Sequence, residues 1–176
     1  MSLYHILFAC LLLGVFIELS HKETPKVYFN ICFSVLTLML CLRFGQGADY
    51  YSYNSIFTTM PLTLPELLTY RFGKVEIGWR FLCAAFKLLG CSFPFMIFVL
   101  AILEMLLFLR FINRYCKYKL FALFLGYHTF YLTYLFGALR QALVIALFLG
   151  LLLEWLLQGK YLRYCVAVCV CVCTVA

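Results

Sequence analysis

The 176-residue sequence has few charged side chains, and only 12% of its residues are Asp, Glu, Lys or Arg. A soluble domain usually has about 25% charged and about 45–50% apolar residues, whereas this chain is 66% hydrophobic. This scarcity of charge excludes a disordered chain and a soluble enzyme. It predicts an all-α fold, a polytopic transmembrane helical bundle in which residues 1–176 form a single membrane domain.

Acidic residues are the scarcer charged class, with seven Asp and Glu against 14 Lys and Arg, for a net charge of +7. In a soluble protein this excess could indicate a nucleic-acid partner. In a membrane chain it is typical of cytoplasmic loops that are rich in Lys and Arg. We therefore expect the lipid bilayer, and no nucleic acid, to be a partner.

Motifs for nucleotides and metals are absent as well. The sequence has no Walker A loop, no GxGxxG and no HExxH. Its ten cysteines include no CxxC pair and no Cys/His ligand spacing. We therefore predict no metal site and no cofactor, and nothing in the sequence supports the use of ATP.

Long apolar runs make up most of the chain and predict about six spans, plus an outer interfacial or re-entrant helix. The run between residues 120 and 139 carries no formal charge and is the clearest of them. The last run is too short to cross a bilayer about 30 Å thick, so we expect a partial span there and a chain truncated at its C-terminus. The predicted spans are residues 3–19, 27–42, 94–112, 120–139, 142–157 and 164–176.

Basic residues predict the orientation of these spans. Eight of the 14 fall in the loops 20–26, 110–119 and 158–163, which we expect to be cytoplasmic. The other six should face outward, as should the N-terminus, because they lie in the long outer loop 43–92 and in the turn 139–141. These six are Arg43, Arg71, Lys74, Arg80, Lys87 and Arg140.

Residues 77–89 are hard to place. They are apolar but short, and they contain Arg80 and Lys87. If they spanned the membrane, the 110–119 loop would be external and the positive-inside rule would fail there. We therefore place them in the outer interface, with Trp79 at the level of the lipid headgroups.

The outer loop begins with R-F-G-Q-G-A-D-Y-Y-S-Y, which has the chemistry of a sugar-phosphate site. A guanidinium can bind phosphate oxygens, a carboxylate can take a proton from a hydroxyl, and aromatic faces can stack on sugars. The same residues are also typical of an interfacial turn with an aromatic belt. The candidates are Arg43, Gly45, Gly47, Asp49, Tyr50, Tyr51 and Tyr53.

Arg140 is a second candidate, since it lies between two apolar runs on the same outer side. It is either a second cation for an anionic lipid head or a snorkelling side chain at a helix end. Tyr127, Tyr131 and Tyr134 share a helix face, and they could line a polar groove that opens toward Arg140. His128 could act as an acid, a base or a phosphate contact, or simply bond to a neighbouring helix.

Two carboxylates complete the set of candidates. Glu104 is near the middle of its predicted span, where a carboxylate is a functional candidate by default. It could equally pair with Lys87 or stay protonated. Glu76 lies where the outer loop returns to the membrane, and could be a second outer carboxylate or an interfacial anchor.

Three short motifs resemble the signature of the EpsG family. The first is Arg43-x-Gly45-x-Gly47-x-Asp49-Tyr50-x-x-Tyr53 followed by Phe57, the second is Glu76-x-Gly78-Trp79, and the third is Arg140-Gln141-Ala142 followed by Ile145 and Ala146. EpsG-family proteins are multi-spanning proteins of exopolysaccharide and capsule biosynthesis, similar to Wzy-type polymerases. The resemblance runs through most of the chain in the family's order.

The chain departs from the family in two motifs and in length. The family often has Thr where this chain has Ala48, and often has Asn shortly before Arg140, where this chain has Gly137-Ala138-Leu139. Family members are about twice as long, so the chain is similar to an N-terminal half.

The resemblance implies a membrane glycosyltransferase of the bacterial cell (inner) membrane. It would polymerise repeat units carried on a polyprenyl-diphosphate-linked oligosaccharide at the outer face. Arg43 and Arg140 would hold the leaving diphosphate, and Asp49, or else Glu76 or His128, would serve as base. Tyr50, Tyr51 and Tyr53 would line the sugar site, and the remaining predicted contacts are Gly45, Gly47 and Gln141.

Two other functions remain open at this level. A transporter or flippase for a lipid-linked sugar would use the same cations and aromatics to bind without catalysis. A non-catalytic membrane subunit of a polysaccharide-export complex would fit a shortened chain. The position of the charges favours the polymerase, because a transporter would place ionisable groups near the midplane.

Overall fold

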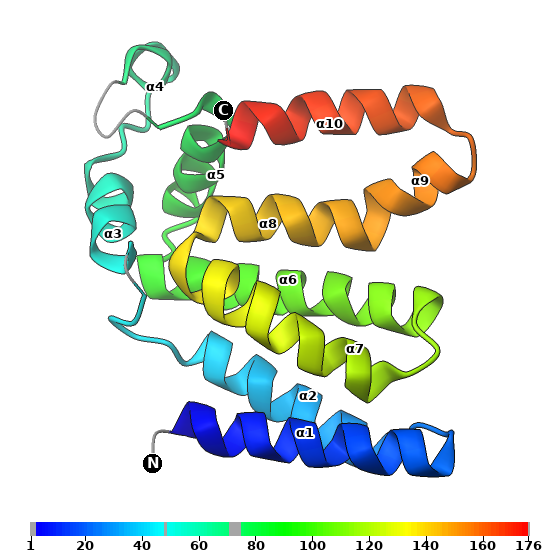
Figure 1. Ribbon diagram of the computed structural model, residues 1–176. Helices are drawn as coiled ribbons and strands as arrows, with labels where there is room; N and C mark the ends of the chain where they lie inside the picture. The colour runs from blue at the N-terminus through cyan, green and yellow to red at the C-terminus, as the bar shows by residue number, and fades with distance from the viewer. Residues whose placement is uncertain (1–2, 48, 71–74, 176) are drawn as a thin grey trace.

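The computed structural model describes residues 3–47, 49–70 and 75–175, and within them it is helical, with no strand (Figure 1). Ala48, Arg71, Lys74 and Ala176 lie outside the described residues. The predicted all-α class is confirmed, with 82% of the chain in helices.

Three helices are long and apolar enough to cross a membrane. They are α1 (Leu3–His21), α6 (Phe93–Tyr115) and the continuous run Leu139–Leu157. The last consists of α8 (Leu139–Leu147), the short π-helix η3 (Phe148–Leu152) and α9 (Leu153–Leu157). These helices cover the predicted spans 3–19, 94–112 and 142–157.

The other three predicted spans form shorter or less regular helices. Residues 27–42 correspond to α2 (Lys26–Cys41), an apolar helix of 16 residues. The range 120–139 divides into α7 (Lys119–Gly126) and the π-helix η2 (Tyr127–Leu135), and the change of geometry falls where the polar stretch begins. The range 164–176 belongs to α10 (Tyr161–Val175), which has 15 residues.

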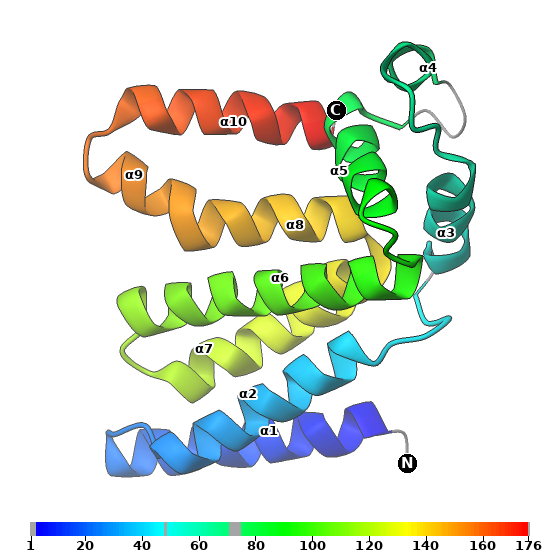
Figure 2. The same cartoon turned by 180° about the vertical axis from the view of Figure 1, so that it is seen from behind.

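These long segments lie side by side and alternate in direction (Figures 1 and 2). α1 packs on α7, α2 on α6, and α6 on α8. Three short helices gather at one end of the bundle, where α1 begins: α3 (Tyr50–Thr59), α4 (Leu64–Thr69) and α5 (Ile77–Leu88). The connections between α1 and α2, α6 and α7, and α9 and α10 lie at the opposite end, so the three predicted basic loops come together there.

Residues 77–88 form the short helix α5. Its 12 residues extend about 18 Å, well short of a bilayer, and it lies across the end of the bundle beside α3 (Figure 1). Arg80 donates from Nε to the Val75 carbonyl oxygen (2.6 Å) and from Nη1 to two carbonyls in the last turn of α4 (3.2 Å each). Lys87 donates from Nζ to the carbonyls of Thr58 (2.7 Å) and Met60 (2.6 Å) at the end of α3.

Trp79 lies inside the protein and not on its surface, where a side chain in contact with lipid headgroups would lie. Its side chain is fully buried, and its ring lies 5.5 Å from that of Tyr53, between centroids. It belongs to a second apolar core at this end of the molecule, formed by α3, α5, the first turns of α6 and the start of α8. A larger core joins α1, α2, α6, α7 and η2. The basic side chains of α5 are partly exposed and bind the ends of α3 and α4.

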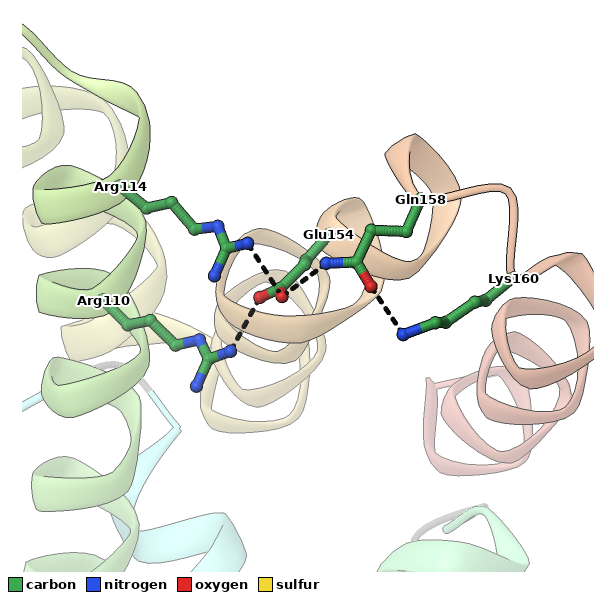
Figure 3. A network of polar contacts seen from close by, with 5 residues as sticks. All are labelled: Arg110, Arg114, Glu154, Gln158 and Lys160. Carbon is green, nitrogen blue, oxygen red and sulfur yellow. Dashed lines mark hydrogen bonds and ion pairs between the residues drawn. The ribbon is translucent and has the colours of Figure 1, made fainter.

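The opposite end is fixed by two buried or half-buried carboxylates. Glu18, at the end of α1, accepts hydrogen bonds from the backbone N–H groups of Leu120 (3.2 Å) and Phe121 (2.9 Å), so it caps the N-terminus of α7. Glu154 accepts from Arg110 (2.7 Å) and Arg114 (3.0 Å), which point toward it from α6 (Figure 3). These contacts tie helices far apart in sequence.

Candidate functional site

The loop after α2 carries the first candidate motif and makes a tight approach to another part of the chain. Gly45 and Gly47 have positive φ angles of 67° and 104°, which L side chains rarely adopt. A Cβ at Gly47 would overlap the carbonyl oxygen of Phe136, just before α8. The two glycines therefore let the first motif touch the segment that leads to Arg140.

Arg140 joins three elements that are distant in sequence. Its Nε donates to the Tyr53 hydroxyl oxygen (3.0 Å), and its Nη1 forms an ion pair with the Glu76 carboxylate. Its Cζ lies 5.6 Å from the centroid of the Tyr53 ring, within cation–π range. Tyr53 is in α3, Glu76 precedes α5, and Arg140 begins α8. The structure thus brings together one residue from each predicted motif.

This guanidinium is neither buried nor free. The side chain of Arg140 is 26% exposed and that of Glu76 is 13% exposed. No acceptor in the described part of the chain lies within hydrogen-bond distance of Nη2. Arg140 is therefore oriented by a carboxylate and a hydroxyl, and it retains a donor edge that can reach an anion.

Of the other two tyrosines of the first motif, one is buried in the protein and one is exposed. Tyr50 is buried, and its ring lies 5.2 Å from that of Phe93. Tyr51 is 69% exposed and available to a ligand. Asp49, which precedes them, is also exposed, and its side chain makes no hydrogen bond to the start of α3.

Arg43 lies deeper than predicted. It is 5% exposed, and none of its guanidinium nitrogens has a hydrogen-bond partner among the described residues. Its Cζ lies 5.7 Å from the ring centroid of Phe136. Burial lowers the pKa of the Arg43 guanidinium, and the carboxylate of Glu104 is the largest influence in the opposite direction.

Glu104 does not pair with Lys87, which was one of our alternatives. Its electrostatic influence is on Arg43. It is fully buried in α6, and both carboxylate oxygens lack a hydrogen-bond partner in the described part of the chain. Lys87 instead binds the end of α3. No hydrogen bond or ion pair joins these two buried groups among the described residues, so the influence of Glu104 on Arg43 is a longer-range electrostatic one.

The tyrosines of η2 do not open toward Arg140, which corrects our expectation of a polar groove in that direction. The Tyr127 hydroxyl donates to the Tyr4 carbonyl oxygen in α1 (2.9 Å), and the Tyr131 hydroxyl donates to the Leu36 carbonyl oxygen in α2 (2.7 Å). Their rings stack with centroids 5.6 Å apart, while Tyr134 packs on Phe130. The π-helix therefore uses its tyrosines to hold neighbouring helices.

His128 lies in an open groove of about 760 Å³ between the start of α1, the glycine loop and η2. The groove is lined mostly by aromatic and apolar side chains, and it includes Gly47, Gln46 and Phe136. His128 is exposed there. Gln141 is exposed on α8, and its side chain makes no hydrogen bond to another described residue.

The site contains one participant that the sequence did not single out and one for which it indicated another position. Phe136 contacts Gly47 through its backbone and Arg43 through its ring, but it sits in an apolar run and nothing in the sequence marks it. Trp79 supports Tyr53 from inside the core, although its motif pointed to the interface. Among residues 3–47, 49–70 and 75–175, no group of His, Cys, Asp or Glu could hold a metal ion.

The arrangement can bind an anion at one end of an apolar bundle. A half-buried arginine is oriented there by Glu76 and Tyr53, and an exposed carboxylate and an exposed tyrosine follow the glycine loop. Such a set can stabilise negative charge on a phosphate and can accept a proton from a hydroxyl.

Comparison with known proteins agrees with the three motifs. The sequence model of the EpsG family matches residues 26–174, which is most of the chain, and the predicted resemblance is confirmed. No curated protein and no solved structure shows significant similarity to the chain. The match and the apolar helices indicate a polysaccharide-related membrane protein. The chain belongs to the EpsG family.

Proposed function

We propose that the protein polymerises polysaccharide at the outer face of the bacterial inner membrane, by glycosyl transfer between polyprenyl-diphosphate-linked repeat units. The observation that carries the proposal is the position of Arg140. In an EpsG-family chain, this cation is held by Glu76 and Tyr53 at the end of the bundle opposite the basic loops.

The orientation of the bundle supports an outward-facing site. The connections that carry most of the basic residues lie at one end, and such loops remain in the cytoplasm. The three short helices and both candidate arginines then lie at the outer end. With α5 across that end, about six crossings account for the alternating segments of a multi-pass protein.

In the proposed reaction, a hydroxyl of the acceptor sugar attacks the anomeric carbon of the growing chain. The bond from that carbon to the lipid diphosphate breaks, and the diphosphate leaves with the bonding electron pair. The hydroxyl proton passes to Asp49, the exposed carboxylate of the glycine loop. The lipid diphosphate bond supplies the energy, so no nucleotide is required.

The two arginines have different tasks in this proposal. Arg140 binds the leaving diphosphate directly through its open edge. Arg43 strengthens the positive potential from its buried position behind the loop. Tyr51 provides an exposed face for a sugar ring, and Tyr50 and Tyr53 support it from the core.

The remaining candidate residues shape the site or extend it. Gly45 and Gly47 fold the loop against Phe136. His128 and Gln141 are exposed contacts for the sugar or the lipid head. A polysaccharide-export complex is a further partner in this proposal.

The test replaces Arg140 by Ala, with Lys117→Ala as a matched loss of one cation at the opposite end. Polymer is measured on gels, and the sidedness of lipid-linked repeat units is measured with a membrane-impermeant sugar oxidant. We expect R140A to lose long polymer, to accumulate repeat units at the outer face, and to reach the membrane at the normal level. Lys117→Ala should make normal polymer.

Two outcomes would contradict the proposal. Polymer of normal length in R140A would exclude the diphosphate contact. Repeat units trapped at the inner face would indicate a flippase, in which the same cation binds the lipid head during transport.

A further inference from the structure

A groove is lined by side chains of the run Leu139–Leu157 and of α10. α10 lies on the side of this run away from α6 (Figure 1). Its volume is about 550 Å³. The lining side chains are apolar apart from one arginine, and they come from both walls: Leu151 and Trp155 on one, and Leu162, Arg163, Val166 and Ala167 on the other.

The charged mouth of this groove lies at the end that carries the basic loops. Arg163 is exposed in the first turn of α10, and Lys160 is exposed just before it. The nearby carboxylate of Glu154 does not neutralise them, because Arg110 and Arg114 already bind it (Figure 3). The Lys160 ammonium binds only the Gln158 side chain among the described residues (2.7 Å). The mouth therefore presents uncompensated positive charge.

The apolar part of the groove runs inward from this charge. From Arg163 to Cys171, which lines the far end, α10 advances about 12 Å. The rim is apolar too, since Leu162 is 81% exposed and Val166 is 59% exposed. A ligand that fits must combine an anionic head with a hydrocarbon segment that follows the helix.

We propose that this groove binds an anionic phospholipid, with its phosphate at Arg163 and one acyl chain between the run Leu139–Leu157 and α10. Anionic lipids are attracted to basic residues at the cytoplasmic surface, and basic pockets between helices bind their headgroups. The occupant is not the proposed substrate, because the diphosphate site around Arg140 lies at the opposite end of the bundle. The groove is a second lipid site, independent of the glycosyl-transfer proposal.

The experiment is native mass spectrometry of the purified chain, released from nanodiscs that contain phosphatidylglycerol and phosphatidylcholine. We expect wild-type protein to retain phosphatidylglycerol selectively. Arg163→Gln should retain it about fivefold less, since a basic residue at the surface contributes about that factor. Ala167→Phe should lose it as well, because the ring fills the groove without a change in charge.

The matched control is Lys22→Gln, which removes an exposed cation at the same end but outside the groove. It should retain the lipid like the wild type, and circular dichroism should show equal helix content in all variants. Retention by both R163Q and A167F would overturn the proposal. Loss of phosphatidylglycerol in R163Q with full retention in A167F would show that only surface charge attracts the lipid, and not the groove. A dimer mass in the wild type that is absent in A167F would show that a second copy of the chain occupies the groove.

Discussion

Arg43 and Arg140 lie at the same end of the bundle in different surroundings. Arg140 is half-buried, with one hydroxyl and one carboxylate as partners. Arg43 is buried without a hydrogen-bond partner among the described residues, and Glu104 acts on it only through a longer-range electrostatic influence. An arginine with an open donor edge can exchange water for a ligand, whereas a buried one can do so only if the core rearranges.

Replacement of Gly47 by Ala should damage the site by a steric route. The Cβ would meet the Phe136 carbonyl oxygen at a backbone φ of 104°. Gly90→Ala is the matched control, because Gly90 also has a positive φ (70°), but a Cβ added there would have no atom within 4 Å. We expect Gly90→Ala to cost about 1–2 kcal/mol of unfolding free energy and Gly47→Ala to cost more, as measured by thermal unfolding in detergent. Equal losses of unfolding free energy in the two variants would show that the close approach of Gly47 to Phe136 does not contribute to stability.

Removal of Glu104 should take away the largest favourable electrostatic influence on the buried charge of Arg43. We expect Glu104→Ala to destabilise the protein by about 0.5–3 kcal/mol, read as a fall in Tm. The double variant Arg43→Met/Glu104→Leu should recover most of the loss, because it buries no charge. Glu66→Ala, an exposed carboxylate on α4, is the control and should leave Tm unchanged. A double variant as unstable as Glu104→Ala would refute the electrostatic coupling.

At this scale, the sequence indicated three residues that make contact, Arg140, Glu76 and Tyr53, one from each motif. It did not indicate how they contact one another. The electrostatic influence of Glu104 on Arg43 depends on the rotation of α6 and on the course of the loop after α2, neither of which has a local sequence signal. The same holds for Phe136, whose contribution is partly a backbone oxygen.

Among the elements, α5 shows how two cations can keep an apolar helix at the end of a bundle. Arg80 and Lys87 each bind backbone carbonyls at the C-terminus of a neighbouring helix, where the helix dipole favours positive charge. Moving either side chain into hydrocarbon would break these bonds and leave a lone charge in lipid.

Lys87→Met should therefore loosen the end of α3. It removes two charge-assisted hydrogen bonds and keeps the apolar stem, so we expect about 1–3 kcal/mol less local stability. Hydrogen exchange of the peptide that covers α3 should speed up about tenfold or more, while peptides from α1 keep their wild-type rate. Lys26→Met, at the other end, is the control. Unchanged exchange in α3 would mean that the lysine makes no effective cap.

The helices themselves were largely predictable, because apolar runs, prolines and basic loops mark where each begins and ends. The π-helical geometry of η2 was not. The stretch from Tyr127 to Tyr134 showed only that polar residues interrupt an apolar run. Their hydroxyls bind carbonyls of α1 and α2, which are contacts that only the packed bundle determines.

At the scale of the molecule, the position of α5 decides on which side of the membrane each later loop lies. Single cysteines at Asp49, at the native Cys91 and at Lys117 test this in a background without the other cysteines. With a membrane-impermeant maleimide, we expect labelling of 49 and 91 from outside and of 117 only after permeabilisation. Position 91 is decisive, since it would label from inside if α5 crossed the membrane.

The placement of the basic loops at a common end was predictable from charge and length. The loops 20–26, 110–119 and 158–163 lie at the same end of the bundle. The packing of the first helix against α7, and not only against its neighbour α2, could not be predicted, because it rests on the Glu18 cap.

That cap also sets an order of events during synthesis. Glu18 is made 102 residues before Leu120, whose backbone N–H it binds. At a ribosome speed of about 5–20 residues per second, the carboxylate is without this partner for roughly 5–20 s. Its place in the last turn of α1 keeps it near the aqueous boundary meanwhile, where it avoids the cost of a lone charge in hydrocarbon. The packing of α1 on α7 therefore forms only after the ribosome has made Leu120, whereas its packing on α2 can form earlier.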